Sequence, residues 1–157
     1  MRLNSAFDAE AATEIVRELS TLEGPLLPIL HALQNRFGHV SEEAIRLISA
    51  ELNLSRAEVY GVVSFYHDYH REPQGRHVLK VCRAEACQAA GGDAIAASIE
   101  EALGLSFGQT SPDGQVTLEA VYCLGLCATA PSAMVDKRLV GRLNAAKVAA
   151  LVDEVRL

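Results

Sequence analysis

The sequence predicts an α+β protein in two parts: a small N-terminal helical bundle, followed by an α/β domain with a mixed four-stranded sheet. Apolar residues recur at helical spacing through roughly the first seventy residues. Beyond the polar segment HREPQGRH, short apolar runs typical of strands alternate with helical patterns. Because this segment carries Pro73 and Gly75, we place the domain boundary there, with residues 1–72 in the first domain and 73–157 in the second.

The first domain contains four predicted helices. Their apolar residues are Ala12, Ile15, Val16 and Leu19; Leu26, Leu30, Leu33 and Phe37; Ile45, Ile48 and Leu52; and those of AEVYGVVSFY. Gly38 is expected to end the second helix. Ser41 is a predicted N-cap of the third helix, and Ser55 forms a predicted capping box with Glu58 at the start of the fourth. Helices this short need a partner surface as well as their own core.

The second domain is predicted to run strand, helix, strand, strand, strand, helix. The corresponding segments are HVLKVC, GGDAIAASIEEALG, QVTLEAVY, the two arms of a hairpin AMVDKRLVG that turns near Asp136–Lys137, and a last helix capped by Asn144 with Val148, Leu151, Val152 and Val155 on its buried side. In QVTLEAVY, Val116, Leu118 and Ala120 alternate with Thr117, Glu119 and Val121, which predicts a half-buried strand. The segment SPDG is a predicted turn before the second strand. This order is close to that of the thioredoxin core.

Composition excludes several classes of function. The formal net charge of −6 argues against a general nucleic-acid binder, and no apolar run approaches the roughly 20 residues of a membrane span. The segment MRLNSAFDAEAATEIV lacks the apolar core of a secretory signal, so we expect a cytoplasmic protein with reduced thiols rather than a disulfide-bonded domain. Glycine motifs for nucleotides or flavins are absent, and no catalytic residues are predicted.

All four cysteines fall in two short phrases, VCRAEACQAAGG and VYCLGLCATAPSAMV. Cys82 and Cys87 follow the first predicted strand, and Cys123 and Cys127 follow the next one. If these strands are neighbours, both pairs leave one edge of the sheet and can converge. Four thiolates at one point imply a metal, because a cation offsets their mutual repulsion. The candidates are structural zinc and an iron–sulfur cluster.

Spacing favours a [2Fe–2S] cluster over zinc. Neither pair has the two-residue spacing of most zinc knuckles or of thioredoxin-type redox sites, although zinc and a four-iron cluster both stay open. Gly125 allows peptide N–H groups to approach the sulfurs. Gly91 and Gly92 either allow the same approach of N–H groups beside the first cysteine pair or simply form the start of a helix. Pro131 is either a cis proline that fixes the second loop or a trans proline, and trans is the more frequent state of such bonds.

The chain resembles the thioredoxin-like [2Fe–2S] subunit family of NADH-linked complexes, which includes the 24 kDa-type subunit of NADH dehydrogenase. The matching phrases are LLPILHALQNRFGHVSEEAI, VYGVVSFYHDY, the Pro73, Gly75 and His77 positions, both cysteine pairs, TSPDGQVTL and CLGLCATAP. Within the family, CRAEACQAAGG is most similar to the gamma subunit of NAD-dependent formate dehydrogenase. Val116 and Val140 depart from aromatic residues that are frequent in the family.

The resemblance implies that Cys82 and Cys87 hold one iron and Cys123 and Cys127 the other. It also implies that the helical domain, 1–72, docks a flavoprotein subunit carrying FMN and binding NAD(H). The chain would then be an electron-transfer subunit, non-catalytic alone, of a soluble formate dehydrogenase with a molybdenum- or tungsten-dependent catalytic subunit. The alternatives are the equivalent subunit of respiratory NADH:quinone oxidoreductase or of a hydrogenase diaphorase and, from a different class, a zinc-stapled interaction module.

Overall fold

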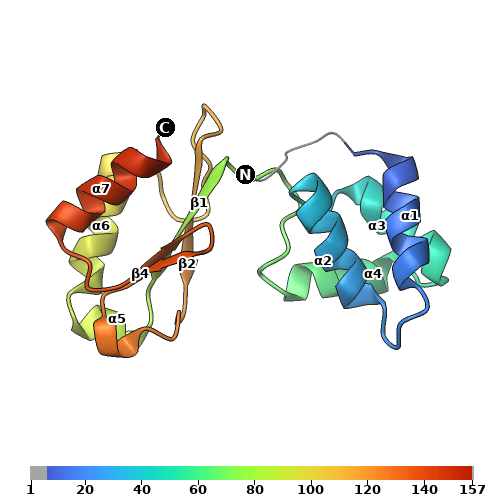
Figure 1. Ribbon diagram of the computed structural model, residues 1–157, viewed down its shortest axis with the longest axis horizontal. Helices are drawn as coiled ribbons and strands as arrows, with labels where there is room; N and C mark the ends of the chain where they lie inside the picture. Colours follow the sequence, from blue (N-terminus) through green and yellow to red (C-terminus); the bar gives the residue numbers. More distant parts are fainter. Residues whose placement is uncertain (1–6, 157) are drawn as a thin grey trace. The chain divides into compact units, whose positions relative to one another are not determined.

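The computed structural model of the chain describes residues 7–156. It divides the chain into two compact units, Met1–Pro73 and Gln74–Leu157 (Figure 1). The first unit is helical throughout its regular structure, whereas the second combines helices with a sheet. Among the residues described, no helix is both long and apolar enough to cross a membrane.

The first unit contains the four expected helices. Their bounds are α1 Ala9–Leu19, α2 Leu26–Phe37, α3 Glu42–Leu52 and α4 Arg56–Phe65. The helix ends follow from local chemistry. Gly38 ends α2 with a φ of 84°, Ser41 accepts the Ala44 N–H at 3.2 Å, and Ser55 forms the predicted capping box with Glu58. These three predictions are confirmed.

One apolar core joins the four helices of this unit. Its fully buried side chains include Ala12 and Val16 of α1, Ile29, Leu30 and Leu33 of α2, Ile45 and Ile48 of α3, and Val59 of α4. The helical periodicity therefore identified the buried face of each helix. Ile15, Leu19 and Leu52 pack at the margin of the core and are only partly buried.

The second unit is built on a mixed sheet with strand order β2-β1-β3-β4. The strands are β1 His77–Cys82, β2 Val116–Val121, β3 Ala133–Val135 and β4 Arg138–Val140. β1 and β2 are parallel, joined through α6 (Gly92–Leu103), while β1–β3 and β3–β4 are antiparallel. The last helix is α7 (Ala145–Val155), which Asn144 caps as predicted. The predicted fold class is confirmed.

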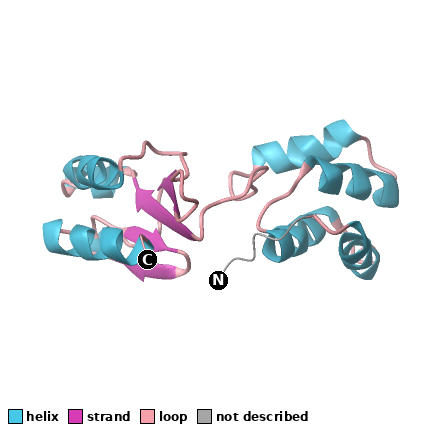
Figure 2. Cartoon of the chain, turned by 90° about the horizontal axis from the view of Figure 1, so that it is seen from above, coloured by secondary structure: helices cyan, strands magenta, loops and turns pink. Residues whose placement is uncertain are grey.

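Helices α6 and α7 lie on the same side of this sheet (Figures 1 and 2). Leu79, Val81, Val116 and Leu118 alternate along β1 and β2 and form a core with residues of both helices. Thr117, on the opposite face of β2, is also buried, because its hydroxyl accepts the Gly75 N–H at 2.7 Å and pairs with a second threonine. Simple alternation predicted Thr117 to be the exposed partner, which is wrong at this position.

Three features of the second unit differ from the prediction or go beyond it. A short helix, α5 (Glu85–Ala89), lies inside the first cysteine loop. Residues 108–111 run beside β2 and cover its outer edge with backbone hydrogen bonds. The Ala130–Pro131 bond is cis, the less frequent of the two states that the sequence left open.

Asp136 ties the β3–β4 turn to the start of β1. Its carboxylate accepts the Val78 N–H at 3.0 Å and contacts His77 Nδ1 at 2.9 Å, while its own N–H donates to the Val78 carbonyl at 2.9 Å. The turn places Asp136 at a φ of 54°, a conformation that aspartate tolerates better than most residues. The predicted hairpin turn at Asp136–Lys137 is therefore confirmed and anchored.

Candidate metal centre

Both cysteine pairs leave the sheet from the same end of two neighbouring parallel strands. Cys82 is the last residue of β1 and is aligned with Val121, the last residue of β2. Cys123 follows Val121 by only two residues. The Arg83 N–H continues the alignment by donating to the Val121 carbonyl at 2.8 Å. The sheet thus places the two loops together, as the sequence predicted on the condition that β1 and β2 are neighbours.

The first pair is buried. Cys82 is 3% exposed and Cys87, on α5, is 2% exposed. The Cys82 N–H donates to the Ser132 carbonyl at 3.0 Å, and Cys87 Sγ lies 3.5 Å from the Ser132 hydroxyl. Contacts to the segment after the second pair therefore hold the first pair in place.

The second pair is exposed. Cys123 Sγ and Cys127 Sγ are 3.8 Å apart, and the Gly125 N–H donates to Cys123 Sγ at 3.3 Å. Gly125 has a φ of 74° and Cys123 a φ of 111°, so the loop turns its peptide groups toward the sulfur. The predicted N–H approach at Gly125 is confirmed.

The thiols of the two pairs influence each other electrostatically. Burial raises the pKa of Cys82, but hydrogen bonds from the Ala84 N–H, the Cys87 thiol and the N–H groups of Leu124 and Cys123 together lower it below its usual range. The pKa of Cys127 is raised, first by its hydrogen bond with Cys123 and then by the charges of the other cysteines. Donors from the second loop therefore reach a sulfur of the first.

This geometry fits a metal with sulfur ligands. Two sulfurs bound at about 2.3 Å to one tetrahedral ion lie about 3.8 Å apart, which is the Cys123–Cys127 separation. Within residues 7–156, no three His, Cys, Asp or Glu side chains are gathered to hold a single ion. The cysteines stand as two pairs, and a cluster of two irons with four cysteine ligands uses them in pairs.

Glycines at the start of α6 bring this helix against the first cysteine loop. Gly91 is its N-cap, with a φ of 87°, and a Cβ on Gly92 would lie 2.5 Å from the Cys87 carbonyl oxygen. Any larger residue at position 92 would push α6 away from Cys87. The simpler of the two interpretations of this glycine pair, a helix start, is the one observed.

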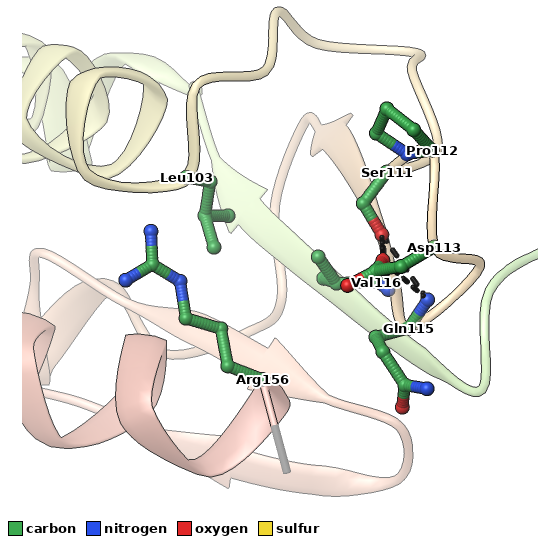
Figure 3. Close-up of a pocket in the computed structure, with 7 residues that line it drawn as sticks. All are labelled: Leu103, Ser111, Pro112, Asp113, Gln115, Val116 and Arg156. Carbon is green, nitrogen blue, oxygen red and sulfur yellow. Dashed lines mark hydrogen bonds between the residues drawn. The ribbon is translucent and has the colours of Figure 1, made fainter.

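A cavity of about 320 Å³ lies at the end of β2 away from the cysteine loops (Figure 3). Asp113 accepts hydrogen bonds from the Ser111 hydroxyl and the Gln115 N–H, and the first of these chiefly lowers the pKa of Asp113. Arg156 lines the opposite wall and donates to the Ala102 carbonyl. The contacts of Asp113 close the predicted SPDG turn, so we assign the cavity to that turn and the candidate site to the cysteine loops.

Comparison with known proteins identifies the family. Residues 12–156 match the thioredoxin-like [2Fe-2S] ferredoxins. The chain belongs to this family. The predicted cofactor, one [2Fe–2S] cluster, is thereby confirmed, and the chain is a [2Fe–2S] electron-transfer protein.

The relatives are subunits of larger NAD(P)-linked enzymes. The chain is 31% identical over 141 residues to the NADP-reducing hydrogenase subunit HndA of Solidesulfovibrio fructosivorans, covering 90% of this chain and 82% of that one. It is 34% identical over 145 residues to an NADH-quinone oxidoreductase subunit of Mycobacterium tuberculosis, covering 92% of this chain and 58% of that one. A crystal structure of an NAD+-reducing [NiFe]-hydrogenase matches with a TM-score of 0.73 and 26% identity, over 83% of this chain and 22% of that chain.

Ser132 is the residue near the site that the sequence interpretation missed. It sits in the phrase CATAPSAMV, five residues after Cys127, and nothing in that phrase relates it to Cys87. The contact depends on β3 pairing with β1, which brings residue 132 beside the end of β1. A prediction that β3 pairs antiparallel with β1, the strand that ends in Cys82, could therefore have identified Ser132.

Proposed function

We propose that this chain is an electron-transfer subunit in which Cys82 and Cys87 hold one iron of the cluster and Cys123 and Cys127 hold the other. The observation that carries the proposal is the alignment of both cysteine loops at one end of β1 and β2, with the second pair at the sulfur spacing of a tetrahedral ion. When bound, a [2Fe–2S] cluster takes up and releases single electrons.

The residues of the chain have distinct tasks in this proposal. The N–H groups that reach Cys82 and Cys123 stabilise the negative charge on these sulfurs. Cys82 and Cys87 lie where water is excluded, whereas Cys123 and Cys127 are open to solvent. Electrons would therefore enter and leave on the side of the second pair.

The proposed partner is a flavoprotein subunit that carries FMN and binds NAD(H), docked through the helical unit. Tyr60, Phe65 and Tyr66 of α4 and its C-cap are exposed aromatic side chains, and aromatic residues are enriched at protein interfaces. We propose as parent complex a soluble, cytoplasmic NAD-dependent formate dehydrogenase with a molybdenum- or tungsten-dependent catalytic subunit. The motif CRAEACQAAGG supports this assignment.

The names of the relatives support a second parent complex. They are subunits of hydrogenases and of NADH-quinone oxidoreductases. In such a complex, this chain would transfer electrons in the same way, and the ultimate electron donor or acceptor would differ.

The first test is the visible spectrum of the purified chain before and after dithionite, with iron and zinc counted in the same sample. A brown protein that bleaches, with about two irons per chain, is expected. A colourless protein containing zinc, which anaerobic iron and sulfide do not convert, would contradict the proposal and favour a zinc-stapled module.

The second test identifies the parent complex. An affinity-tagged chain is purified with its native partners, and formate, hydrogen and NADH are each supplied as reductant. Bleaching by formate together with co-purified molybdenum or tungsten is expected. Bleaching by hydrogen with nickel, or by NADH alone with quinone-reducing subunits, would instead assign the chain to one of the alternative complexes.

A further inference from the structure

Ser132 contacts both cysteines of the buried pair. It lies between Pro131 and β3 and is 1% exposed. Its carbonyl accepts the Cys82 N–H at 3.0 Å, and its hydroxyl oxygen lies 3.5 Å from Cys87 Sγ. A single residue that follows the exposed pair in the sequence thus contacts the buried pair in the fold.

The direction of the hydroxyl–sulfur hydrogen bond depends on the state of Cys87. Between a thiol and a hydroxyl, either atom can donate. A cysteine that ligates a metal does so as a thiolate, which has no proton, so Ser132 must then be the donor. Within residues 7–156, the Ser132 hydroxyl makes no other hydrogen bond. Its proton is therefore available to Cys87.

We propose that Ser132 is a positioning residue that raises the reduction potential of the cluster by donating its hydroxyl proton in a hydrogen bond to Cys87 Sγ. The inference rests on the proposed ligand set. Reduction would add one negative charge to the cluster, which its sulfur ligands share in part, and a fixed donor at close range to a sulfur stabilises the reduced form more than the oxidised form. One electron is taken up in this step; no bond forms or breaks, and the hydroxyl keeps its proton.

Ser132 differs from the other donors at the site in a way that makes it testable. The Gly125 N–H donates to Cys123 Sγ from the backbone, so a side-chain substitution leaves that donor in place. The Ser132 hydroxyl belongs to a side chain, and Ser132→Ala removes it while the carbonyl that holds the Cys82 N–H remains. The variant therefore separates the hydroxyl from the backbone contact.

The experiment is a redox titration of the cluster-loaded full-length chain, followed by visible absorption with dithionite as reductant. Ser132→Ala is expected to lower the potential by the equivalent of about tenfold in the one-electron equilibrium, which is about 59 mV. The matched control is Ser98→Ala in α6, whose hydroxyl donates to the Ile95 carbonyl at 2.8 Å. Its potential is expected to equal that of the unsubstituted chain.

A second pair of variants controls for packing at this buried position. Ser132→Thr and Ser132→Val add nearly the same volume, but only threonine keeps the hydroxyl. With equal iron content, the threonine variant is expected to have the higher potential. Equal potentials in this pair, or an unchanged potential in Ser132→Ala, would overturn the inference.

Two further outcomes have a defined meaning. Loss of iron from Ser132→Ala would also overturn the inference, because the hydroxyl would then be needed to assemble the site rather than to set its potential. An unsubstituted chain that binds no iron would refute the proposed function itself, and this inference with it. A loaded chain whose potential does not depend on Ser132 refutes the inference alone.

Discussion

The interior of each of the two units is stabilised in a different way. The helical unit has a continuous apolar core, and capping residues satisfy several of its helix ends. The sheet unit has its own core between one face of the sheet and α6 and α7. Its first cysteine loop is held by a few particular contacts, those of Cys82 and Cys87 with Ser132 and the close approach of Gly92 to Cys87. The first unit is therefore specified by many interchangeable apolar contacts, and the cysteine end of the second by a few particular ones.

This difference teaches where each unit is sensitive. An apolar core tolerates substitutions that keep volume and pattern, because no single contact dominates. A loop that must deliver sulfurs to a metal depends on each residue that sets its path, because metal binding and folding are coupled. Removal of the metal should thus lower the stability of the sheet unit and leave that of the helical unit unchanged.

The largest expected effect is that of cluster removal. Chelation under reducing conditions should lower the stability of the sheet unit by several kcal/mol, because the free energy of metal binding is part of its folding free energy. The helical unit contains no cysteine and should keep its stability. Segment-resolved amide hydrogen exchange measures both units in one sample. Equal loss of protection in the two units would break the comparison.

Matched leucine truncations test whether the two cores are equivalent. Leu33→Ala in α2 and Leu118→Ala in β2 each remove a side chain that is 0% exposed. Each should cost about 3–5 kcal/mol, mostly in its own unit, since each creates a cavity in a separate core. The amides of the unit that carries the change should lose protection first. A cost below about 1 kcal/mol for either would show that its core relaxes around the gap.

Two glycine-to-alanine substitutions, one in each unit, should change the free energy of unfolding in opposite directions. Gly92→Ala would bring a Cβ against the Cys87 carbonyl and should cost about 2–3 kcal/mol in the sheet unit. Gly61→Ala in α4 meets no atom within 4 Å and should stabilise the helical unit by about 0.5–1 kcal/mol, because alanine favours a helix. Urea unfolding of the two variants measures both. Destabilisation by Gly61→Ala would contradict the open space seen there.

The smallest effect concerns the capping box of α4. Hydrogen bonds from the Ser55 hydroxyl and N–H lower the pKa of Glu58 below its usual 4.5. The ionised Glu58 therefore stabilises the helical unit above that pH, and this contribution is lost as the pH falls through the lowered value. Glu58→Gln should reduce stability slightly at pH 7, and the difference should vanish in acid. A difference that persists in acid would exclude ionisation as its cause.

The sequence was sufficient for the helical unit because its signals are local. Ser41, Ser55 and Gly38 mark helix ends within a turn of where they act, and apolar spacing identified the buried faces. In the sheet unit, the strands were predictable for the same reason, and the convergence of the two loops was predictable on the condition that β1 and β2 are neighbours. Thr117 and Ser132 were not, because their partners lie 42 and 45 residues away. The cis bond at Pro131 also has no sequence signal, since most prolines are trans.

The contact between Asp136 and β1 fixes the register of the β3–β4 hairpin against β1. Strands of three residues have few pairs to hold their alignment, and a slip by one residue would turn every side chain to the other face. Leu139 would then replace Arg138 on the face where Arg138 now pairs with Glu154 of α7. Since β3 begins directly after Ser132, the same slip would displace the hydroxyl from Cys87. The β3–β4 turn contains no cysteine, yet it helps to align the sulfur site. It does so through Asp136, which binds Val78 of β1 across 58 residues of sequence.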